Sequence, residues 1–212
     1  MRGCYAAGHR GGAGGIGGNG LLGQSLDWPL LLAPVAYQQL AHPEGELATA
    51  RAAMAMRTGM VVSTLSSCTL EAIAQAAQAA AQELGRSGPL WFQLYQQPAR
   101  EHTLQLIRRA EDAGYQALVW TVDAHIKRSS YPLPPGVEAV NLHGMPRQSQ
   151  SGDLMSEHIL FGSELARSAP TWDDLVWLRQ QTRLPLIVKG LLSARAAAQA
   201  VELGADAIVV SN

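Results

Sequence analysis

The chain has 212 residues, a formal net charge of −1 and a charged fraction of only 16%. This length suits one α/β domain with a sizeable core and is short for two. The balanced charge excludes the basic surface that nucleic-acid binding requires, and no apolar run approaches the roughly 20 residues that span a bilayer. Cys4 and Cys68 lie far apart without a partner motif, so we expect reduced thiols and a cytoplasmic protein.

Residues 1–20 are dominated by glycine and contain too little apolar surface to fold by themselves. Gly15 to Gly20 formally matches a Gly-x-Gly-x-x-Gly dinucleotide pattern, but no strand precedes it and no helix follows. The N-terminus also lacks the apolar core of a signal peptide. We therefore expect residues 1–20 to be a flexible tail and residues 21–212 to form one domain.

From residue 29 onward, short apolar runs alternate with Ala-rich helical stretches that are followed by glycine. Strands are predicted at residues 29–36, 60–64, 90–95, 117–123, 185–189 and between Gly204 and Ser211. Helices are predicted from His42 to a C-cap at Gly59, from Thr69 to about Leu84, at 100–113, at 171–182 and between the last two strands. This repeat predicts an α/β fold, an incomplete (β/α)₈ TIM barrel with about six of the eight strands.

The regular alternation is interrupted after the fourth predicted strand. Residues from about 124 to 170 are rich in Pro, Gly, Ser and His and show little periodicity. A loop of this length in a compact domain is usually functional or disordered. The alternation resumes at Thr171-Trp-Asp-Asp174, a sequence typical of a capping box at the start of a helix.

Polar or small residues stand at the carboxyl end of every predicted strand. They are Pro34, Val35, Ala36, Ser63, Gln93, Tyr95, Thr121, Asp123, Lys189 and Ser211. In a barrel of parallel strands these ends meet at one face, so residues far apart in the sequence would form one site. Their mixture of amide, hydroxyl, phenol, carboxylate and ammonium groups suits a flat heterocycle with many donors and acceptors. The histidines show no metal-ligand spacing, so we expect no metal site.

Each of these residues also has an ordinary structural interpretation. Lys189 could be a surface lysine whose stem packs along an apolar strand. Gln93 and Tyr95 could be core residues at the top of a barrel, and Asp123 could cap the following loop. The local sequence alone leaves these alternatives open.

The motifs acquire a stronger meaning when they are taken together and in order. They are Leu32-Ala-Pro34-Val-Ala36, His42-Pro-Glu-Gly-Glu46, Ser63-Thr-Leu-Ser66, Trp91-Phe-Gln93-Leu-Tyr95, Thr121-Val-Asp123, Leu133-Pro-Pro-Gly136, Thr171-Trp-Asp-Asp174, Leu184-Pro-Leu-Ile-Val-Lys189-Gly190 and Gly204-Ala-Asp-Ala-Ile-Val-Val-Ser-Asn212. In this order the chain resembles the FMN-dependent α-hydroxy acid dehydrogenase/oxidase family, which includes glycolate oxidase, L-lactate dehydrogenase and mandelate dehydrogenase. The resemblance covers about residues 21–212.

The resemblance implies an enzyme that uses FMN to oxidise a small L-2-hydroxy acid, such as lactate or glycolate, to the 2-oxo acid. It assigns to the cofactor the residues Pro34, Val35, Ala36, Ser63, Gln93, Thr121, Lys189 and Ser211. Within the set, Lys189 would stabilise negative charge near flavin N1 and the C2 carbonyl. Tyr95 would hydrogen-bond the substrate, Asp123 would orient the catalytic histidine, and Arg128 would bind the substrate.

The resemblance also implies features that this chain does not match. In the family the Ser-Asn pair leads into His-Gly-Gly-Arg, which supplies the catalytic base and an arginine for the substrate carboxylate; this sequence stops at Asn212. We therefore expect a chain truncated at both ends and inactive alone. The family further implies a possible homo-oligomer, since relatives often form tetramers, and peripheral membrane association if the electron acceptor is a quinone.

Two other functions remain open at this stage. One is a lyase on the same barrel that uses Lys189 to form a Schiff base. The other is a non-catalytic fragment, because six strands leave two open edges in an eight-stranded barrel. The sequence does not identify the hydroxy acid or the electron acceptor.

Overall fold

The computed structural model describes residues 19–123, 133–145 and 169–211. The Gly-rich stretch up to residue 18, most of the long segment predicted at 124–170, the proposed substrate residue Arg128, and Asn212 lie outside the described residues. Asn19 and Gly20, which the prediction placed in the tail, form the start of a strand.

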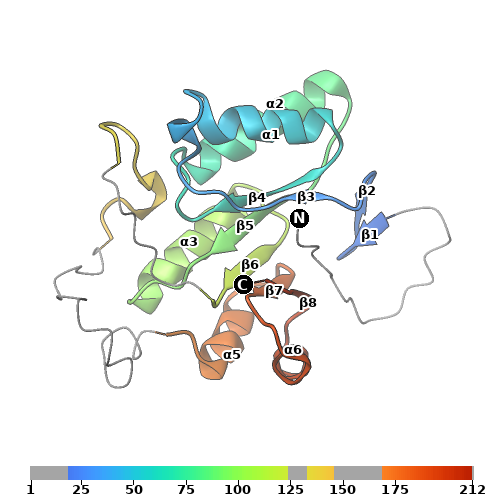
Figure 1. Ribbon diagram of the computed structural model, residues 1–212, viewed down its shortest axis with the longest axis vertical. Helices are drawn as coiled ribbons and strands as arrows, with labels where there is room; N and C mark the ends of the chain where they lie inside the picture. The colour runs from blue at the N-terminus through green and yellow to red at the C-terminus, as the bar shows by residue number, and fades with distance from the viewer. Residues whose placement is uncertain (1–18, 124–132, 146–168, 212) are drawn as a thin grey trace.

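A parallel sheet is the centre of the fold (Figure 1). Its six strands follow one another in the order of the sequence: β3 (Leu31–Leu32), β4 (Gly59–Ser63), β5 (Leu90–Leu94), β6 (Leu118–Thr121), β7 (Leu186–Lys189) and β8 (Ala207–Val209). Every neighbouring pair is parallel. The predicted partial barrel with about six strands is therefore confirmed.

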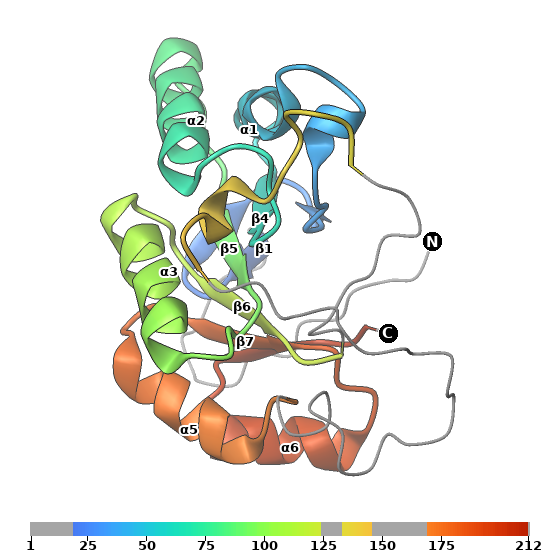
Figure 2. The same cartoon turned by 90° about the vertical axis from the view of Figure 1, so that its left-hand side faces the viewer.

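Helices connect the strands and cover one side of the sheet. They are α1 (Gly45–Ala55), α2 (Leu70–Leu84), α3 (Arg100–Asp112), α5 (Trp172–Gln181) and α6 (Ala194–Glu202), with short 3₁₀ turns η1 (Gln38–Leu40) and η2 (Val140–Leu142). Figure 2 shows them as an arc around the curved sheet, from α1 and α2 at one end to α5 and α6 at the other. Among the described helices, none is both long and apolar enough to cross a membrane.

The two faces of the sheet are buried in separate apolar clusters. The larger cluster lies between the strands and the helices and includes Phe92, Leu118 and Val188. The smaller cluster is on the opposite, concave face and consists of Val61, Trp91, Ala117, Val119, Ile187 and Ala207, with partly buried neighbours packed against it. Successive residues of a strand point to opposite faces, so burial on both sides explains the nearly continuous apolar runs in the sequence.

A small antiparallel hairpin that the sequence analysis did not predict packs against the concave face. It is formed by β1 (Asn19–Leu21) and β2 (Gln24–Leu26). Leu21 packs against the smaller apolar cluster of the concave face. The Trp91 indole N–H donates to Gln24 Oε1 at 2.7 Å, and Gln24 Nε2 donates to the Gln116 carbonyl at 3.2 Å. Gln116 precedes β6, so the hairpin covers the amino-terminal end of the strands and leaves the carboxyl ends for the site.

The first predicted helix differs most from its expected boundaries. Pro43 was expected in its first turn, but the helix begins at Gly45, and it ends at Ala55 rather than at a Gly59 cap. Arg57 adopts the left-handed conformation, with φ of 54°, that was expected of a glycine after the helix. Gly59 is instead the first residue of β4, where a Cβ atom would lie 2.2 Å from Leu31 Cδ2. The close approach of two strands, and not a helix end, explains this glycine.

Other predicted boundaries are confirmed. Thr69 caps α2 by accepting a hydrogen bond from the Ala72 N–H, and Gly85 ends the helix with φ of 59°. Thr171 and Asp174 form the predicted capping box at the start of α5. The first predicted strand, by contrast, is reduced to Leu31–Leu32.

Asn141 anchors the segment of residues 133–145 to the helix layer. Its side chain is 1% exposed; Oδ1 accepts from the Leu70 N–H at 3.0 Å and from Arg109 at 2.8 Å. Its Nδ2 group donates to Ser66 Oγ at 2.8 Å and to the Cys68 carbonyl at 3.1 Å. One amide therefore connects η2 with the loop after β4, with the start of α2 and with the last turn of α3.

Asn141→Ala should lower the free energy of unfolding by about 2 kcal/mol, because it leaves the buried Leu70 N–H without its acceptor and removes the donor to Ser66 Oγ and to the Cys68 carbonyl. Urea unfolding followed by circular dichroism measures this loss. His143→Ala is the matched control in the same segment, since its side chain is 56% exposed, and it should change the stability by about 0.5 kcal/mol or less. Equal effects of the two substitutions would contradict the anchoring role.

Candidate active site

The predicted site residues share one face of the sheet because side chains alternate along a strand. Val61, Trp91, Val119, Ile187 and Val209 face the concave cluster. Counting forward in steps of two from these positions gives Ser63, Gln93, Tyr95, Thr121, Asp123, Lys189 and Ser211. The strand register aligns Ser63 with Gln93 and Thr121 with Lys189. The apolar inner face therefore becomes polar at the carboxyl ends of the strands.

Gln93 lies at the centre of this polar zone and is 1% exposed. Its Oε1 atom accepts hydrogen bonds from Ser63 Oγ at 3.2 Å and from the Thr64 N–H at 3.3 Å. Because a backbone N–H can only donate, the amide oxygen must face Thr64 and the amide nitrogen must face away. That nitrogen, Nε2, is buried without a hydrogen-bond partner among the described residues.

Thr121 provides a second unpartnered group on the neighbouring strand. Its side chain is 2% exposed, and its Oγ1 atom has no hydrogen-bond partner in the described part of the chain. Buried polar groups are nearly always hydrogen-bonded, so each exception requires an explanation. Gln96 Oε1 and Trp120 Nε1 are also buried without a partner among the described residues, so the position of Gln93 and Thr121 is the distinguishing feature. Both stand at the carboxyl ends of adjacent strands on the concave face, where one ligand could supply hydrogen-bonding atoms to both.

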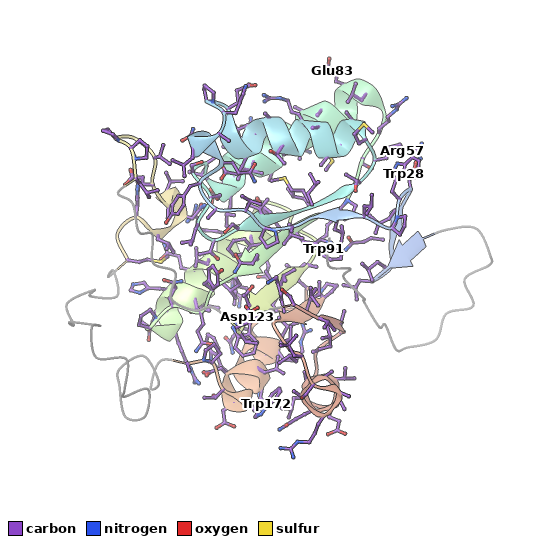
Figure 3. All side chains as sticks on the ribbon, viewed as in Figure 1. Trp28, Arg57, Glu83, Trp91, Asp123 and Trp172 are labelled. Carbon is purple, nitrogen blue, oxygen red and sulfur yellow. The ribbon has the colours of Figure 1, made fainter. Side chains whose placement is uncertain are left out.

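Lys189 and Asp123 place opposite charges beside these groups. The Lys189 Nζ and Asp123 Oδ2 atoms are 3.9 Å apart, and their side chains are 21% and 17% exposed. Asp123 is the second residue after β6 and lies near the middle of the molecule in Figure 3, away from Trp28 and Arg57. The site therefore contains an ammonium group and a carboxylate that retain partial contact with solvent.

Tyr95 completes the arrangement as a neutral hydrogen-bonding group. Burial raises the pKa of its phenol, and the negative charge of Asp123 raises it further. A phenol in this environment stays protonated at neutral pH and can donate a hydrogen bond. The backbone N–H of Tyr95 donates to the Thr64 hydroxyl at 3.0 Å. The Thr64 hydroxyl in turn donates to the Gln93 carbonyl at 2.6 Å. Thr64, to which the sequence analysis gave no role, thus joins the ends of β4 and β5.

Gly190 is a second contributor that sequence reasoning missed. Its φ of 109° disfavours other residues, and a Cβ atom would lie 2.6 Å from Asp123 Cγ and 2.9 Å from Asp123 N. The Val122 N–H donates to the Lys189 carbonyl at 2.9 Å, which brings the ends of β6 and β7 together. A glycine directly after the charged end of a strand was the signal that could have revealed this contact.

The remaining predicted residues lie at the two ends of the strand order. Pro34, Val35 and Ala36 follow β3; the first and last are half-buried, whereas Val35 is 55% exposed. Ser211 follows β8 and is half-buried. Arg128 lies outside the described residues. Within the described ranges, no group of three or more His, Cys, Asp and Glu side chains could hold a metal ion.

Comparisons with known proteins agree with this geometry. The sequence profile of a family described as "FMN-dependent dehydrogenase" matches residues 19–212. An L-lactate oxidase of Alicycliphilus denitrificans is 47% identical over 200 residues, which cover 91% of this chain and 52% of that protein. A peroxisomal (S)-2-hydroxyacid oxidase of Arabidopsis thaliana is 38% identical, with coverage of 91% and 52%. The chain thus spans about half the length of these relatives.

Solved structures show the same fold. A variant of mandelate oxidase with (S)-mandelic acid has a TM-score of 0.73 at 34% identity, covering 99% of this chain and 56% of that one. A mandelate oxidase variant with a C4a-OH-FMN adduct has a TM-score of 0.67 at 35% identity, covering 86% of this chain and 48% of that one.

Gly190→Ala should destabilise the protein more than Gly114→Ala, although both glycines have positive φ, 109° and 84°. The backbone strain alone costs about 1–2 kcal/mol, and only Gly190 adds a clash, with Asp123, for about 1–3 kcal/mol more. At Gly114 a Cβ atom would have no neighbour within 4 Å. Denaturant unfolding of both variants gives the difference, and equal losses would show that Asp123 does not press on Gly190.

Tyr95 should ionise above the ordinary phenol value of 10.0, because the folded state raises its pKa. Subtracting the ultraviolet pH titration of Tyr95→Phe from that of the unchanged protein isolates this phenol. The unfolded chain ionises first, so this residue's contribution to stability is present below pH 10 and lost as the pH rises towards the folded pKa. Asp123→Asn should lower the midpoint of the Tyr95 titration, because it removes the negative charge that is the smaller of the two causes of the raised pKa. A midpoint at or below 10.0 would contradict the burial of Tyr95.

Proposed function

The chain belongs to the FMN-dependent dehydrogenase family, and on that premise we propose that it forms the flavin-facing part of a 2-hydroxy acid oxidoreductase. The reaction proposed is the oxidation of a small L-2-hydroxy acid to the 2-oxo acid, with FMN as the electron acceptor. The observation that carries the proposal is the pair of buried polar atoms Gln93 Nε2 and Thr121 Oγ1, which have no partner among the described residues. They lie at the ends of β5 and β6, and Lys189 ends the next strand, β7, in register with Thr121.

The residues present fit the chemistry of FMN. The isoalloxazine ring carries carbonyl oxygens and ring nitrogens along one edge, which supply an acceptor for Gln93 Nε2 and a partner for Thr121 Oγ1. The Ser63 hydroxyl donates to Gln93 Oε1 at 3.2 Å. The backbone of Pro34 to Ala36 follows β3, the strand next to the one that Ser63 ends. A flat ring with donors and acceptors would therefore account for groups that have no partner among the described residues.

FMN supplies the redox chemistry when bound, by accepting the pair of electrons that leaves the substrate. Lys189 contributes positive charge that stabilises the negative charge of the reduced state. Tyr95 stays neutral, because burial raises the pKa of its phenol, and donates a hydrogen bond to the substrate. Asp123 supplies a carboxylate that orients a protonatable base and stabilises it once it is protonated. Arg128, outside the described residues, is proposed to bind the substrate.

A lyase that uses Lys189 in a Schiff base explains the structure less well, because it leaves Gln93 Nε2 and Thr121 Oγ1 without partners. The identity of the hydroxy acid stays open, since the relatives include oxidases of lactate, glycolate and 4-hydroxymandelate. Assembly as a homo-oligomer and a cytoplasmic location stay predictions. Among the relatives, the Arabidopsis oxidase is peroxisomal by name.

Lys189→Met should weaken binding of reduced FMN at least tenfold, equivalent to about 1.4 kcal/mol, and weaken binding of oxidised FMN less. The reason is that reduction adds negative charge beside the ammonium group. Titration of the purified chain with FMN, followed by flavin fluorescence before and after anaerobic reduction, measures both affinities. Arg183→Met is the matched control: this exposed cation precedes β7 at the opposite end of the strand and should leave both unchanged.

The same preparation tests catalysis. Adding L-lactate or glycolate without oxygen should bleach bound FMN if the chain contains a working site, whereas binding without bleaching would support a non-catalytic fragment. A chain that does not quench FMN fluorescence at all would contradict the proposed cofactor.

A further inference from the structure

Glu46 is a fully buried carboxylate that the proposed reaction does not use. It lies in the first turn of α1 and is 0% exposed. Its Oε1 atom accepts hydrogen bonds from the backbone N–H groups of Gln38 and Ser67, each at 3.0 Å. Its Oε2 atom accepts from the Ser67 hydroxyl at 2.8 Å. Two separate loops therefore converge on one side chain.

Both loops connect directly to proposed cofactor residues. Gln38 follows the stretch Pro34–Ala36 after β3, and Ser67 lies four residues after Ser63, which ends β4. The loops also contact each other: the Tyr37 N–H donates to the Leu65 carbonyl at 3.0 Å, and the Leu65 N–H donates to Ser63 Oγ at 3.1 Å. A displacement of the Gln38 loop would therefore reach Ser63 through these two hydrogen bonds.

The start of α1 is shaped to hold these loops. Gly45 has φ of 48°, and a Cβ atom there would lie 2.8 Å from Gln39 Cγ and 3.4 Å from Ser67 Oγ. One turn further along the helix, Thr49 Oγ1 donates to Gln38 Oε1 at 2.6 Å. Successive residues of one helix face thus contact the same two loops.

The energetics distinguish Glu46 from an ordinary helix-start carboxylate. A glutamate in a first turn usually stays in solvent, where it interacts with the helix dipole. Removal of a carboxylate from water is costly unless hydrogen bonds replace the lost hydration. In the described structure the Glu46 carboxylate accepts hydrogen bonds from Gln38 and Ser67, which belong to the two loops and not to its own helix. Its burial therefore depends on the loops holding one fixed separation.

We propose that Glu46 is a positioning residue that fixes the separation between the backbone of Pro34–Ala36 and the Ser63 hydroxyl, the two groups that flank one side of the flavin site. This inference rests on the proposed function for its ligand, whereas the link between the loops is independent of it. Glu46 itself does not contact the flavin. It acts through the amides of Gln38 and Ser67.

Hydrogen exchange on the full chain without flavin tests the link. In Glu46→Ala the amides of Gln38 and Ser67 should exchange at least tenfold faster than in the unchanged protein, relative to the amides of β5, which report global opening. Glu46→Gln keeps one side-chain oxygen as an acceptor. The amides of Gln38 and Ser67 should therefore exchange more slowly in Glu46→Gln than in Glu46→Ala. Ala53→Gly, a buried position in the same helix, is the matched control for general destabilisation and should not accelerate these two amides selectively.

FMN titration of the same variants tests the consequence. Glu46→Ala should raise the dissociation constant at least tenfold, Glu46→Gln should restore part of the affinity, and Ala53→Gly should match the unchanged protein. Unchanged exchange at Gln38 and Ser67 would overturn the link, whether or not flavin binds. Faster exchange with unchanged FMN affinity would overturn the positioning role. If the unchanged chain binds no FMN, the proposed function and the flavin part of this inference both fail, and exchange alone decides the link.

Discussion

The two-residue repeat of a parallel strand, combined with an in-register sheet, is the constraint on which the site depends. An apolar layer on the concave face includes Trp91, Val119 and Ile187. Two positions further along the same strands stand the polar residues Gln93, Thr121 and Lys189. A shift of one residue in any strand would move its polar group into the apolar layer under the helices. Burial on both faces therefore fixes the register, and the register fixes the site.

This constraint explains why the fold, and the edge of the sheet that the proposed site residues share, could be predicted from sequence, whereas their contacts could not. Apolar runs separated by Ala-rich stretches were sufficient to place six parallel strands and to bring Ser63 and Gln93 to the same edge. The capping box at Thr171 uses only local contacts, so its sequence predicts it directly. The roles of the individual residues, in contrast, depend on a ligand, and they stay predictions.

The features that sequence reasoning missed depend on contacts between distant residues. Gly59 was predicted as a helix cap, but the crowding by Leu31 and Pro89 that requires it is a property of packed strands. The hairpin of β1 and β2 is held by a hydrogen bond from Trp91 to Gln24, which are 67 positions apart. No local pattern reports such a pair. The β propensity of the residues cannot predict short segments whose stability comes from distant partners.

Hydrogen bonding separates the buried polar groups of this molecule into two kinds. Glu46 and Asn141 are fully satisfied by backbone and side-chain partners, so their burial is explained by the fold itself. Gln93 Nε2 and Thr121 Oγ1 are buried as deeply but have no partner among the described residues. The described part of the chain offers no hydrogen bond that would compensate the desolvation of these two groups. Both lie at the carboxyl ends of strands on the face that also carries Lys189 and Asp123, and in the proposed function the bound flavin ring would supply the missing hydrogen bonds. The satisfied carboxylate of Glu46 holds the two loops together, and in the proposed arrangement this would position them beside that ring.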